Sequence, residues 1–406
     1  MKELLAIEGG TPVRETPLAY GRQWIGDDDI AAVAETLKSD YLTCGPKITE
    51  LEDALCAYTG AGYAVAMNSG TAVLHAATHA AGIGEGDEVI VTPFTFMASA
   101  NSALYVGATP VFADIDPDTW NIDPASVEAH VTDKTKAIVA VDYGGEAVDA
   151  DALREICDRH HLVFIEDAAH AIGTTYKGRP TGSYADITTM SFHPVKTVTS
   201  GEGGALLTDN ADYARDARLL RAHGMEHDPA QMRITVPEDD AGAWLCDQLF
   251  LGYNYRMPDL DAALLLSQMK KIDRFIARRK ELVARYDAVF ADMPEIIPQK
   301  RMPWSDAARH LYAVRLDLSK LSCTRKQFFD AMRAENIYCQ VHYVLTYWFS
   351  HYQKRGYRKG LCPVAEAVYA SVLSLPLFPK MTDADQEDVI RAVRKIISHY
   401  AGPSGG

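Results

Sequence analysis

The chain has 406 residues and a formal net charge of −15; 48% of its residues are hydrophobic and 23% are charged. This composition is typical of a globular enzyme, and the length fits two or three domains. The acidic balance disfavours nucleic acid or an anionic membrane as a partner, because both bind basic surfaces. No run of 18 apolar residues predicts a membrane span.

Two features of the sequence indicate the cellular compartment: the N-terminal residues and the cysteines. The stretch MKELLAIEGGTPVRETP lacks an apolar core followed by small residues, so no signal peptide is expected. The seven cysteines are odd in number, are scattered and form no CxxC pair. We therefore expect reduced thiols, a cytoplasmic location and no metal site.

Seven short apolar runs between residues 60 and 210, several of them β-branched, predict strands that are buried on both faces. Helical patterns separate several of them, at 71–84 after the first run and at 151–161 before the fifth. Alternating strands and helices predict a mostly parallel sheet covered by helices. The seven predicted strands are 63–69, 87–96, 109–115, 136–143, 161–170, 186–193 and 203–209.

The pattern changes after about residue 210. Residues 257–290 predict one or two long amphipathic helices, and Pro258 suits a first helical turn. We therefore expect a large domain at 1–255, whose first 20 residues pack elsewhere, and a smaller α+β domain at 256–400. The other predicted elements are helices at 325–335 and 383–399, strands at 310–318 and 337–344, and a flexible tail at 401–406.

Polar residues gather where the predicted strands end, which is where ligands bind in an open parallel sheet. The segment Asn68-Ser69-Gly70-Thr71 joins the first strand to a helix, so its unpaired N–H groups and hydroxyls predict a phosphate site. An ordinary helix cap is the alternative. Phe94 and Phe96 lie at the end of the second strand, where an aromatic ring can stack on a flat ligand or belong to the core.

The fifth strand ends in Glu166 and Asp167, with His170 three residues later. A carboxylate beside apolar strand residues is costly unless it faces a cation. The partner of Asp167 is either a structural basic side chain or a protonated heterocyclic nitrogen.

The stretch TTMSFHPVKTVTSGEGGA contains a single lysine, Lys196, just beyond a strand. A lysine in a dry pocket can hold a carbonyl as a Schiff base, although a surface lysine is the alternative. Ser191 and the following hydroxyls can bind phosphate, and the glycines let the backbone approach a bulky group. The stretch lacks the residue order of a Walker loop, and no dinucleotide-binding GxGxxG motif follows the first strand. Together these features describe a pyridoxal 5'-phosphate site.

Several blocks of the chain resemble the DegT/DnrJ/EryC1/StrS sugar aminotransferases. The resemblance implies the α/β fold of aspartate aminotransferase, known as pyridoxal phosphate fold type I, with a seven-stranded, mostly parallel sheet and a smaller C-terminal α+β domain. The blocks include AYGRQWIGDDDI, NSGTAVLHAA, TPFTFMASAN, EDAAHAIGTTYKG, SFHPVKTVTSGEGGALLT and LGYNYRMPDLDAALLLSQMKKID.

The resemblance assigns roles by position. It implies that Lys196 binds the cofactor as a Schiff base, that Asp167 faces its ring nitrogen, and that His170 lies near its ring hydroxyl. Asn254 is expected to reach the phosphate of a neighbouring subunit's cofactor, which implies a homodimer with shared active sites. The remaining cofactor contacts are expected from Gly70, Thr71, Phe96 and Ser191.

The resemblance is strongest to the branch of pseudaminic acid biosynthesis, through VDYGGEAVD, QVHYVLTYWFSHYQKRGY and CPVAEAVYASVLSLPLFP. It implies amino transfer from L-glutamate, which leaves as 2-oxoglutarate, to C4 of a UDP-4-keto sugar. The product would be UDP-4-amino-4,6-dideoxy-N-acetyl-β-L-altrosamine. Sugar-nucleotide contacts are expected from Asp142, Tyr143, His342 and Tyr343. Arg256 is a candidate to bind the donor's carboxylate, because arginine suits bidentate pairing, or it pairs with Asp259 at a helix start.

Other functions stay open at this point. A related nucleotide-sugar aminotransferase with another keto sugar, such as one for UDP-4-amino-4-deoxy-L-arabinose, is the nearest alternative. A non-catalytic protein on the same fold is disfavoured by the intact lysine and aspartate. A cysteine desulfurase needs a reactive cysteine, and none has an obvious electropositive setting. The family's dehydratases carry histidine in place of the lysine, so Lys196 disfavours that branch.

Overall fold

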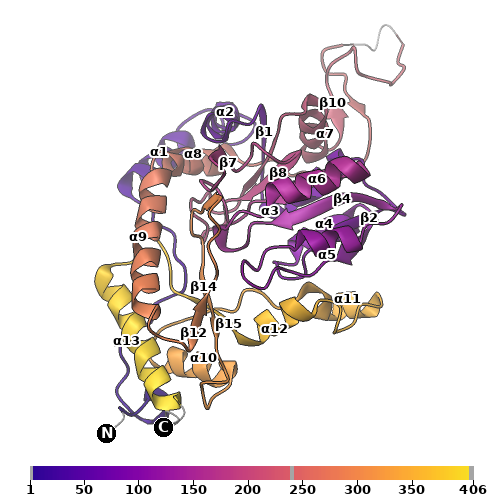
Figure 1. Cartoon of the computed structure of the whole chain (residues 1–406). Helices are drawn as coiled ribbons and strands as arrows, with labels where there is room; N and C mark the ends of the chain where they lie inside the picture. The colour runs from indigo at the N-terminus through magenta and orange to yellow at the C-terminus, as the bar shows by residue number, and fades with distance from the viewer. Residues whose placement is uncertain (1–2, 238–241, 402–406) are drawn as a thin grey trace.

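The seven predicted strands form one sheet in the computed structural model, which describes residues 3–237 and 242–401 (Figure 1). The strand order is β1-β9-β8-β5-β4-β2-β3. Only β9 runs antiparallel to its neighbours, so the predicted mostly parallel sheet is confirmed. The strands are β1 (Tyr63–Met67), β2 (Glu88–Val91), β3 (Thr109–Phe112), β4 (Thr135–Val141), β5 (Val163–Asp167), β8 (Ile187–Ser191) and β9 (Gly204–Thr208).

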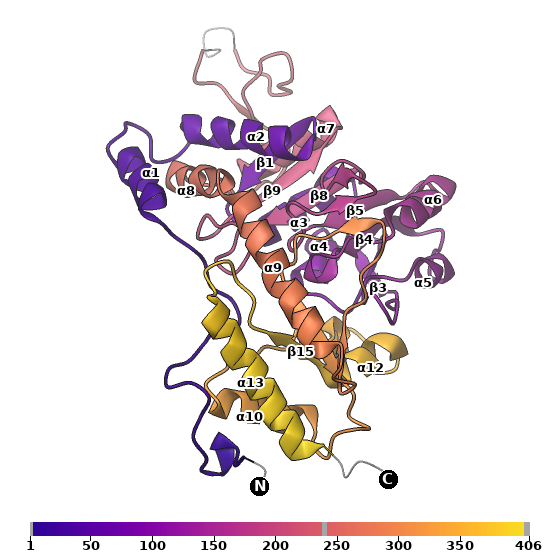
Figure 2. The same cartoon turned by 60° about the vertical axis from the view of Figure 1, so that its left-hand side comes forward.

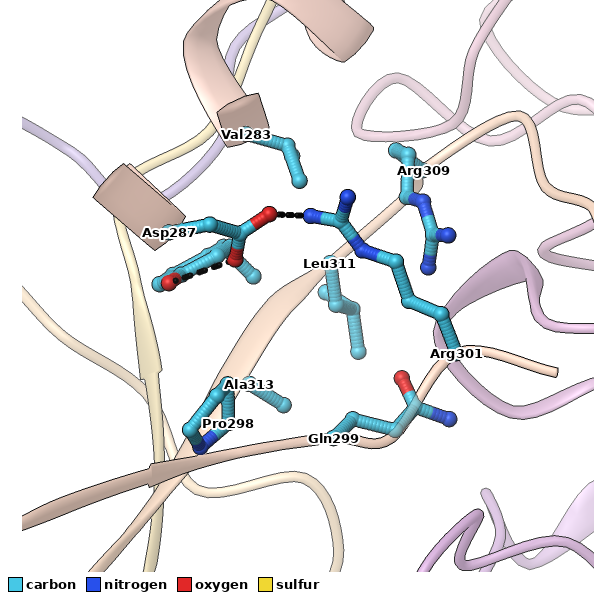
Figure 3. A pocket seen from close by; sticks show the side chains of 9 residues that line it. Val283, Asp287, Pro298, Gln299, Arg301, Arg309, Leu311 and Ala313 are labelled. Carbon is cyan, nitrogen blue, oxygen red and sulfur yellow. Dashed lines mark hydrogen bonds and ion pairs between the residues drawn. The ribbon is translucent and has the colours of Figure 1, made fainter. Parts of the chain in front are cut away.

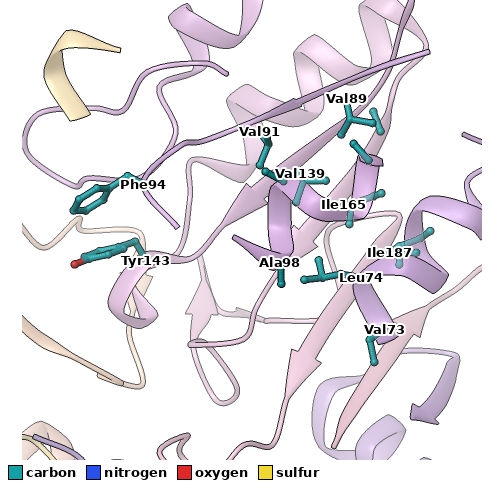
Figure 4. Close-up of a cluster of buried hydrophobic side chains, with 14 of the residues drawn as sticks. Val73, Leu74, Val89, Val91, Phe94, Ala98, Val139, Tyr143, Ile165 and Ile187 are labelled. Carbon is teal, nitrogen blue, oxygen red and sulfur yellow. The ribbon is translucent and has the colours of Figure 1, made fainter. Parts of the chain in front are cut away.

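Helices cover both faces of this sheet. Side chains alternate along each strand, so Val139 and Ile165 face one layer while Ile138 and Phe164 face the other. Figure 4 shows the first layer, where Val73 and Leu74 of α3 pack over the strand residues. The helices around the sheet are α1 (Asp27–Leu37), α2 (Pro46–Thr59), α3 (Gly70–Ala80), α4 (Ala98–Tyr105), α5 (Pro124–Ala129), α6 (Ala150–His160) and α7 (Ala211–Arg221).

The predicted long helical segment is two helices, α8 (Asp259–Met269) and α9 (Ile272–Phe290). The predicted domain boundary at 255/256 precedes α8, but α8 packs on α1 and α2 beside the large sheet. Helix α9 then runs down to a second, antiparallel sheet (Figure 2). That sheet and its covering helices are β12 (Ile296–Pro298), β14 (Tyr312–Leu316), β15 (Val372–Leu375), α10 (Arg325–Ala334) and α13 (Asp383–Tyr400).

The N-terminal segment lies along the smaller sheet's layer, far from the first strand (Figure 2). The buried Glu335 carboxylate accepts the backbone N–H groups of Ala6 and Val13, each at 2.9 Å, and pairs with Lys395 at 3.0 Å. Leu18 then forms a parallel bridge with Ile337. These contacts carry the chain from the small sheet up to the edge of the large one.

Residues 337–344 do not form the predicted strand, so that prediction is wrong. The segment forms only isolated bridges, at Ile337 with Leu18 and at Gln340 with Ser374. Beyond Gln340 it leaves the sheet, and His342 and Tyr343 line a cavity. The following helices, α11 (Ser350–Lys354) and α12 (Pro363–Ser371), return to pack on Phe112 of the large sheet's core.

Short elements complete the fold. No helix in the described ranges is both long and apolar enough to cross a membrane. Residues 402–406 of the predicted flexible tail lie outside the described residues. The short elements are η1 (Ala6–Glu8), η2 (Tyr143–Gly145), β6 (Thr175–Tyr176), β7 (Arg179–Pro180), β10 (Met225–Glu226), β11 (Asp247–Gln248), β13 (Ser305–Asp306) and η4 (Thr346–Trp348).

Candidate active site

A cavity of about 600 Å³ opens at the carboxyl ends of the large sheet's parallel strands. One wall comes from the ends of β5 and β8 and from the start of α3. Further lining comes from the N-terminal segment and from residues 340–344, which are distant from these elements in sequence. Its polar lining includes Tyr20, Asp167, His170, Ser191, Lys196 and Tyr343.

Asp167 is the last residue of β5 and is almost completely buried. Its Oδ2 accepts a hydrogen bond from Ser99 Oγ at 2.6 Å, and its Oδ1 accepts one from the Ala169 N–H at 3.1 Å. Burial raises the pKa of Asp167, while these hydrogen bonds and the charge of Lys196 oppose the increase. A buried carboxylate with this few partners can accommodate a cationic group from a ligand.

Lys196 lies in the turn after β8, where its backbone N–H donates to the His193 carbonyl at 2.9 Å. Burial lowers the pKa of Lys196 to about 8, although the nearby Asp167 charge opposes this decrease. The amine is therefore neutral, and so nucleophilic, in a larger fraction of molecules near neutral pH than an ordinary lysine.

Helix α3 points its N-terminus at the same cavity. Ser69 caps the helix by accepting the Ala72 N–H at 3.1 Å, while Gly70 and Thr71 line the cavity. The first N–H groups of a helix lack partners within it and attract anions. A Cβ at Gly70 would lie 2.9 Å from Ser191 Cβ, so only glycine lets the helix start approach Ser191 this closely.

Of the two phenylalanines in TPFTFMASAN, one belongs to the core and the other lines the cavity. Phe94 is fully buried and faces Tyr143, with ring centroids 4.9 Å apart (Figure 4). Phe96 is 54% exposed and lines the cavity. Phe96 is thus the ring that is available to stack on a flat ligand.

Two residues predicted to contact substrate, Asp142 and Tyr143, do not line the cavity, and their predicted role stays a prediction. Asp142 is fully buried, and its Oδ1 accepts the Val148 N–H at 3.0 Å. Tyr143 is 1% exposed, and its hydroxyl donates to the His342 carbonyl at 2.6 Å. Asp142 directly follows β4, and Tyr143 begins η2.

Asp142 instead belongs to a buried carboxyl pair with Glu166. Tyr184 donates to one Glu166 oxygen and Thr188 to the other, at 2.7 Å for Thr188, while Asp142 Oδ2 has no conventional donor. Burial and the neighbouring Glu166 charge raise the pKa of Asp142. The pair therefore retains a proton, because two like charges cannot both be buried together.

We expect Asp142→Asn to change how stability depends on pH. The folded wild type keeps a proton that the unfolded chain releases, so its free energy of unfolding falls as pH rises above the ordinary carboxyl pKa of about 4. The slope is about 1.4 kcal/mol per pH unit while only the folded state holds the proton. Asparagine replaces that proton with an amide, so the variant should lose this slope in urea titrations between pH 5 and 8.

Asp209→Asn provides a matched control, because Asp209 is an exposed carboxylate that accepts the Gly62 N–H. This variant should keep the wild-type slope. Equal slopes for Asp142→Asn and the wild type would show that the buried pair holds no extra proton.

Asn254 and Arg256 do not line this cavity either. Asn254 is exposed and forms a bridge with Ala222, and its carbonyl accepts from Asn68 Nδ2 at 3.4 Å. It thus lies beside the start of α3 but outside the site of its own chain. Arg256 is half-buried on the same segment. The predicted roles of both residues stay predictions.

Several cavity residues were missed from the sequence. Ser99 holds Asp167 from the start of α4, and Tyr20 comes from the N-terminal segment. Glu202 lies in the Gly-rich turn, and Phe349 follows η4. The block TPFTFMASAN contained Ser99, but its contact with Asp167 is 68 residues away in sequence and had no local signal.

A second hollow lies beneath α9 and has a volume of only about 20 Å³ (Figure 3). Arg301 pairs there with Asp287, and Arg309 pairs with Glu146 at 2.9 Å. These guanidinium groups already have carboxylate partners, and the hollow has room for little more than a water molecule.

The larger cavity therefore presents a half-buried amine with a lowered pKa, a buried carboxylate, a free helix N-terminus with hydroxyls, and an exposed aromatic ring. This set fits an aldehyde, a pyridinium nitrogen, a phosphate and a planar ring, in that order. The fold and the site together define a pyridoxal 5'-phosphate enzyme of fold type I.

Comparison with known proteins agrees with this class. The model of the DegT/DnrJ/EryC1/StrS aminotransferase family matches residues 23–394. The chain is 43% identical over 382 residues to the spore coat polysaccharide biosynthesis protein SpsC of Bacillus subtilis, covering 94% of this chain and 97% of that protein.

Two solved structures share the fold over nearly the whole chain. One is a Streptococcus pneumoniae protein assigned as a sugar aminotransferase, in its PMP form, with 31% identity and a TM-score of 0.88, covering 94% of this chain and 99% of the other. The other is Helicobacter pylori PseC, an aminotransferase of pseudaminic acid biosynthesis, with 30% identity and a TM-score of 0.87, covering 95% and 100%.

The chain belongs to the DegT/DnrJ/EryC1/StrS aminotransferase family. It is a pyridoxal-phosphate-dependent sugar aminotransferase, so the predicted fold class and cofactor are confirmed.

Proposed function

We propose that this enzyme transfers the amino group of L-glutamate to C4 of a UDP-4-keto-6-deoxy-N-acetylhexosamine. The product would be UDP-4-amino-4,6-dideoxy-N-acetyl-β-L-altrosamine, an intermediate of pseudaminic acid biosynthesis. The observation that carries the transamination is that Lys196 and the buried Asp167 line one cavity with the start of α3. The choice of sugar rests on the sequence blocks at 141–149 and 340–357 and on the likeness to PseC.

The residues of the cavity fit bound pyridoxal phosphate. Lys196 would hold its aldehyde carbon, Asp167 its ring nitrogen, and Gly70, Thr71 and Ser191 its phosphate, with Phe96 against the ring. The cofactor supplies an electron sink for the bond that breaks at the amino acid's Cα. Lys196 Nζ, once released, accepts the Cα proton and returns it later, and its lowered pKa of about 8 suits this exchange.

We also propose a homodimer in which Asn254 reaches the cofactor phosphate of the partner subunit. Asn254 lies on an exposed segment between Leu251, which is 78% exposed, and Tyr255, which packs on His75. Exposed apolar side chains beside a polar, projecting residue are typical of an interface. Sedimentation of the purified protein tests the assembly.

A different keto sugar is the second candidate. The identity to SpsC, a spore coat polysaccharide biosynthesis protein, is higher than the identity to PseC, 43% against 30%. This observation favours a nucleotide sugar destined for another surface polysaccharide. The keto precursor of UDP-4-amino-4-deoxy-L-arabinose should therefore be tested as a substrate beside the 4-keto-6-deoxy-N-acetylhexosamine.

An absorption titration tests the proposed function. Excess glutamate should abolish the visible band of the Lys196-bound cofactor, and after its removal one UDP-4-keto sugar should restore that band. Restoration by the 4-keto-6-deoxy-N-acetylhexosamine alone supports the proposed product. Restoration by a different keto sugar contradicts the substrate, and no loss of the band with glutamate contradicts the donor.

A further inference from the structure

The side chain of His170 has one hydrogen-bonding arrangement that fits its surroundings. The Gly144 N–H points at His170 Nδ1, 3.3 Å away, so Nδ1 acts as an acceptor. Burial lowers the pKa of His170 well below its usual value, which keeps the ring neutral. A neutral imidazole that accepts at Nδ1 carries its proton on Nε2.

His170 Nε2 lies 3.0 Å from the hydroxyl oxygen of Tyr343. Because Nε2 carries the proton, it donates and the Tyr343 oxygen accepts. The two ring planes are nearly parallel, at 16°, and their centroids are 6.1 Å apart, so the Nε2–H bond lies close to the plane of the phenol. The hydroxyl proton of Tyr343 must then point away from His170.

Tyr343 lines the cavity, as do Asp167 and Lys196. Within the described part of the chain, its hydroxyl has no second hydrogen-bond acceptor. Burial raises the pKa of Tyr343, with a smaller contribution from Tyr20, so the phenol stays protonated. The result is a neutral donor that faces the cavity without a protein partner.

The backbone around Tyr343 is also held in place. Tyr143 donates to the His342 carbonyl at 2.6 Å, and His342 Nδ1 lies 2.9 Å from Ser374 Oγ. Tyr143 comes from η2, two residues beyond β4 of the large sheet, and Ser374 comes from β15 of the small one. The segment is therefore fixed from both sides, so the Tyr343 hydroxyl is a preorganised donor.

We propose that Tyr343 is a catalytic residue that donates a hydrogen bond to the carbonyl oxygen of the keto substrate. This inference rests on the proposed function, in which an amine adds to a ketone. As the C–N bond forms, the electron pair of the C=O bond moves onto oxygen, and a fixed donor there stabilises the developing charge. Tyr343 keeps its own proton in this step, and His170 directs the hydroxyl by donating to its oxygen.

Tyr343 comes from a different part of the chain than the residues suited to the cofactor, which supports the substrate as the acceptor. The residues suited to the cofactor, Asp167, Ser191 and Lys196, come from the carboxyl edge of the large sheet. Tyr343 comes from the segment 340–344, which lines the cavity together with Tyr20 of the N-terminal segment.

The test compares Tyr343→Phe with Tyr338→Phe, which removes a hydroxyl from the same segment outside the cavity. The pyridoxamine phosphate form of each variant is mixed with the keto sugar and, separately, with 2-oxoglutarate, and the return of the visible band is timed. We expect Tyr343→Phe to react about 10²-fold more slowly, with KM little changed, and the control to match the wild type.

Two further readouts separate this role from a structural one. Nitrogen NMR of the cofactor-free wild type, assigned with His170→Gln, should show the His170 proton on Nε2 at pH 7.5. The pH midpoint of the cofactor's visible band should be the same in Tyr343→Phe and the wild type. A shifted midpoint would place the hydroxyl on the cofactor's ring oxygen and overturn the proposal.

Unchanged rates in Tyr343→Phe, or a His170 proton on Nδ1, would also overturn it. A wrong proposed function would give a different experimental result. A wild type that reacts with 2-oxoglutarate but with no keto sugar would contradict the sugar substrate, while the rates with 2-oxoglutarate would still decide the role of Tyr343.

Discussion

Replacement of Lys196 by alanine is expected to reduce turnover by more than about 10⁴-fold, the upper range for removal of a proton-transfer group. The variant loses both the amine that would hold the cofactor and the base that would move the Cα proton. No other lysine lines the cavity among the described residues, so none is placed to replace it. Steady-state assays of 2-oxoglutarate formation from glutamate measure the effect.

Lys177→Ala is the matched control for this prediction. Lys177 is about half exposed and pairs with Asp151 at 2.7 Å in the turn between β6 and β7. Its loss should leave the rate and the visible cofactor band unchanged. Turnover of Lys196→Ala within tenfold of the wild type would overturn the assignment of Lys196.

Asp167→Asn is expected to lower turnover by roughly 10²- to 10⁴-fold, which corresponds to the 3–5 kcal/mol cost of removing one partner of a buried charge pair. The amide keeps the size of the side chain but cannot balance a protonated ring nitrogen. Without that charge the bound ring withdraws electrons less strongly, so proton removal from Cα slows. Single-turnover decay of the visible band with glutamate measures this step directly.

Ser99→Ala provides a graded comparison, because Ser99 Oγ donates to Asp167 at 2.6 Å. Losing one hydrogen bond to a charged group costs about 1.5–3 kcal/mol, so the rate should fall roughly 10- to 150-fold. An Asp167→Asn variant that is faster than Ser99→Ala would contradict the predicted role of Asp167.

The large sheet was predictable because its signal is local. Each strand is a short β-branched run, and burial on both faces makes those runs continuous. Asp167 and Lys196 could be selected for the same reason, since Asp167 ends such a run and Lys196 follows one. Gly70 and Ser191 could be predicted as site residues because the carboxyl ends of parallel strands meet at one edge of the sheet.

The C-terminal half was less predictable. Residues 337–344 have the composition of a strand, yet only Gln340 pairs with β15 before the segment leaves for the cavity. Composition decides how well a segment fits a sheet, but the positions of neighbouring strands decide whether it pairs. Sequence reasoning likewise placed Asp142 at a strand end without detecting that its side chain is buried.

The sequence by itself determined the parallel sheet, the order of the residues suited to the cofactor, and the family, because these depend on runs and motifs only a few residues long. Only the tertiary structure decided that Asp142 pairs with Glu166, that Ser99 holds Asp167, and that Tyr343 meets His170. Residues 170 and 343 are separated by 173 positions. Their contact depends on how the two halves of the chain pack, and no local pattern of residues records that packing.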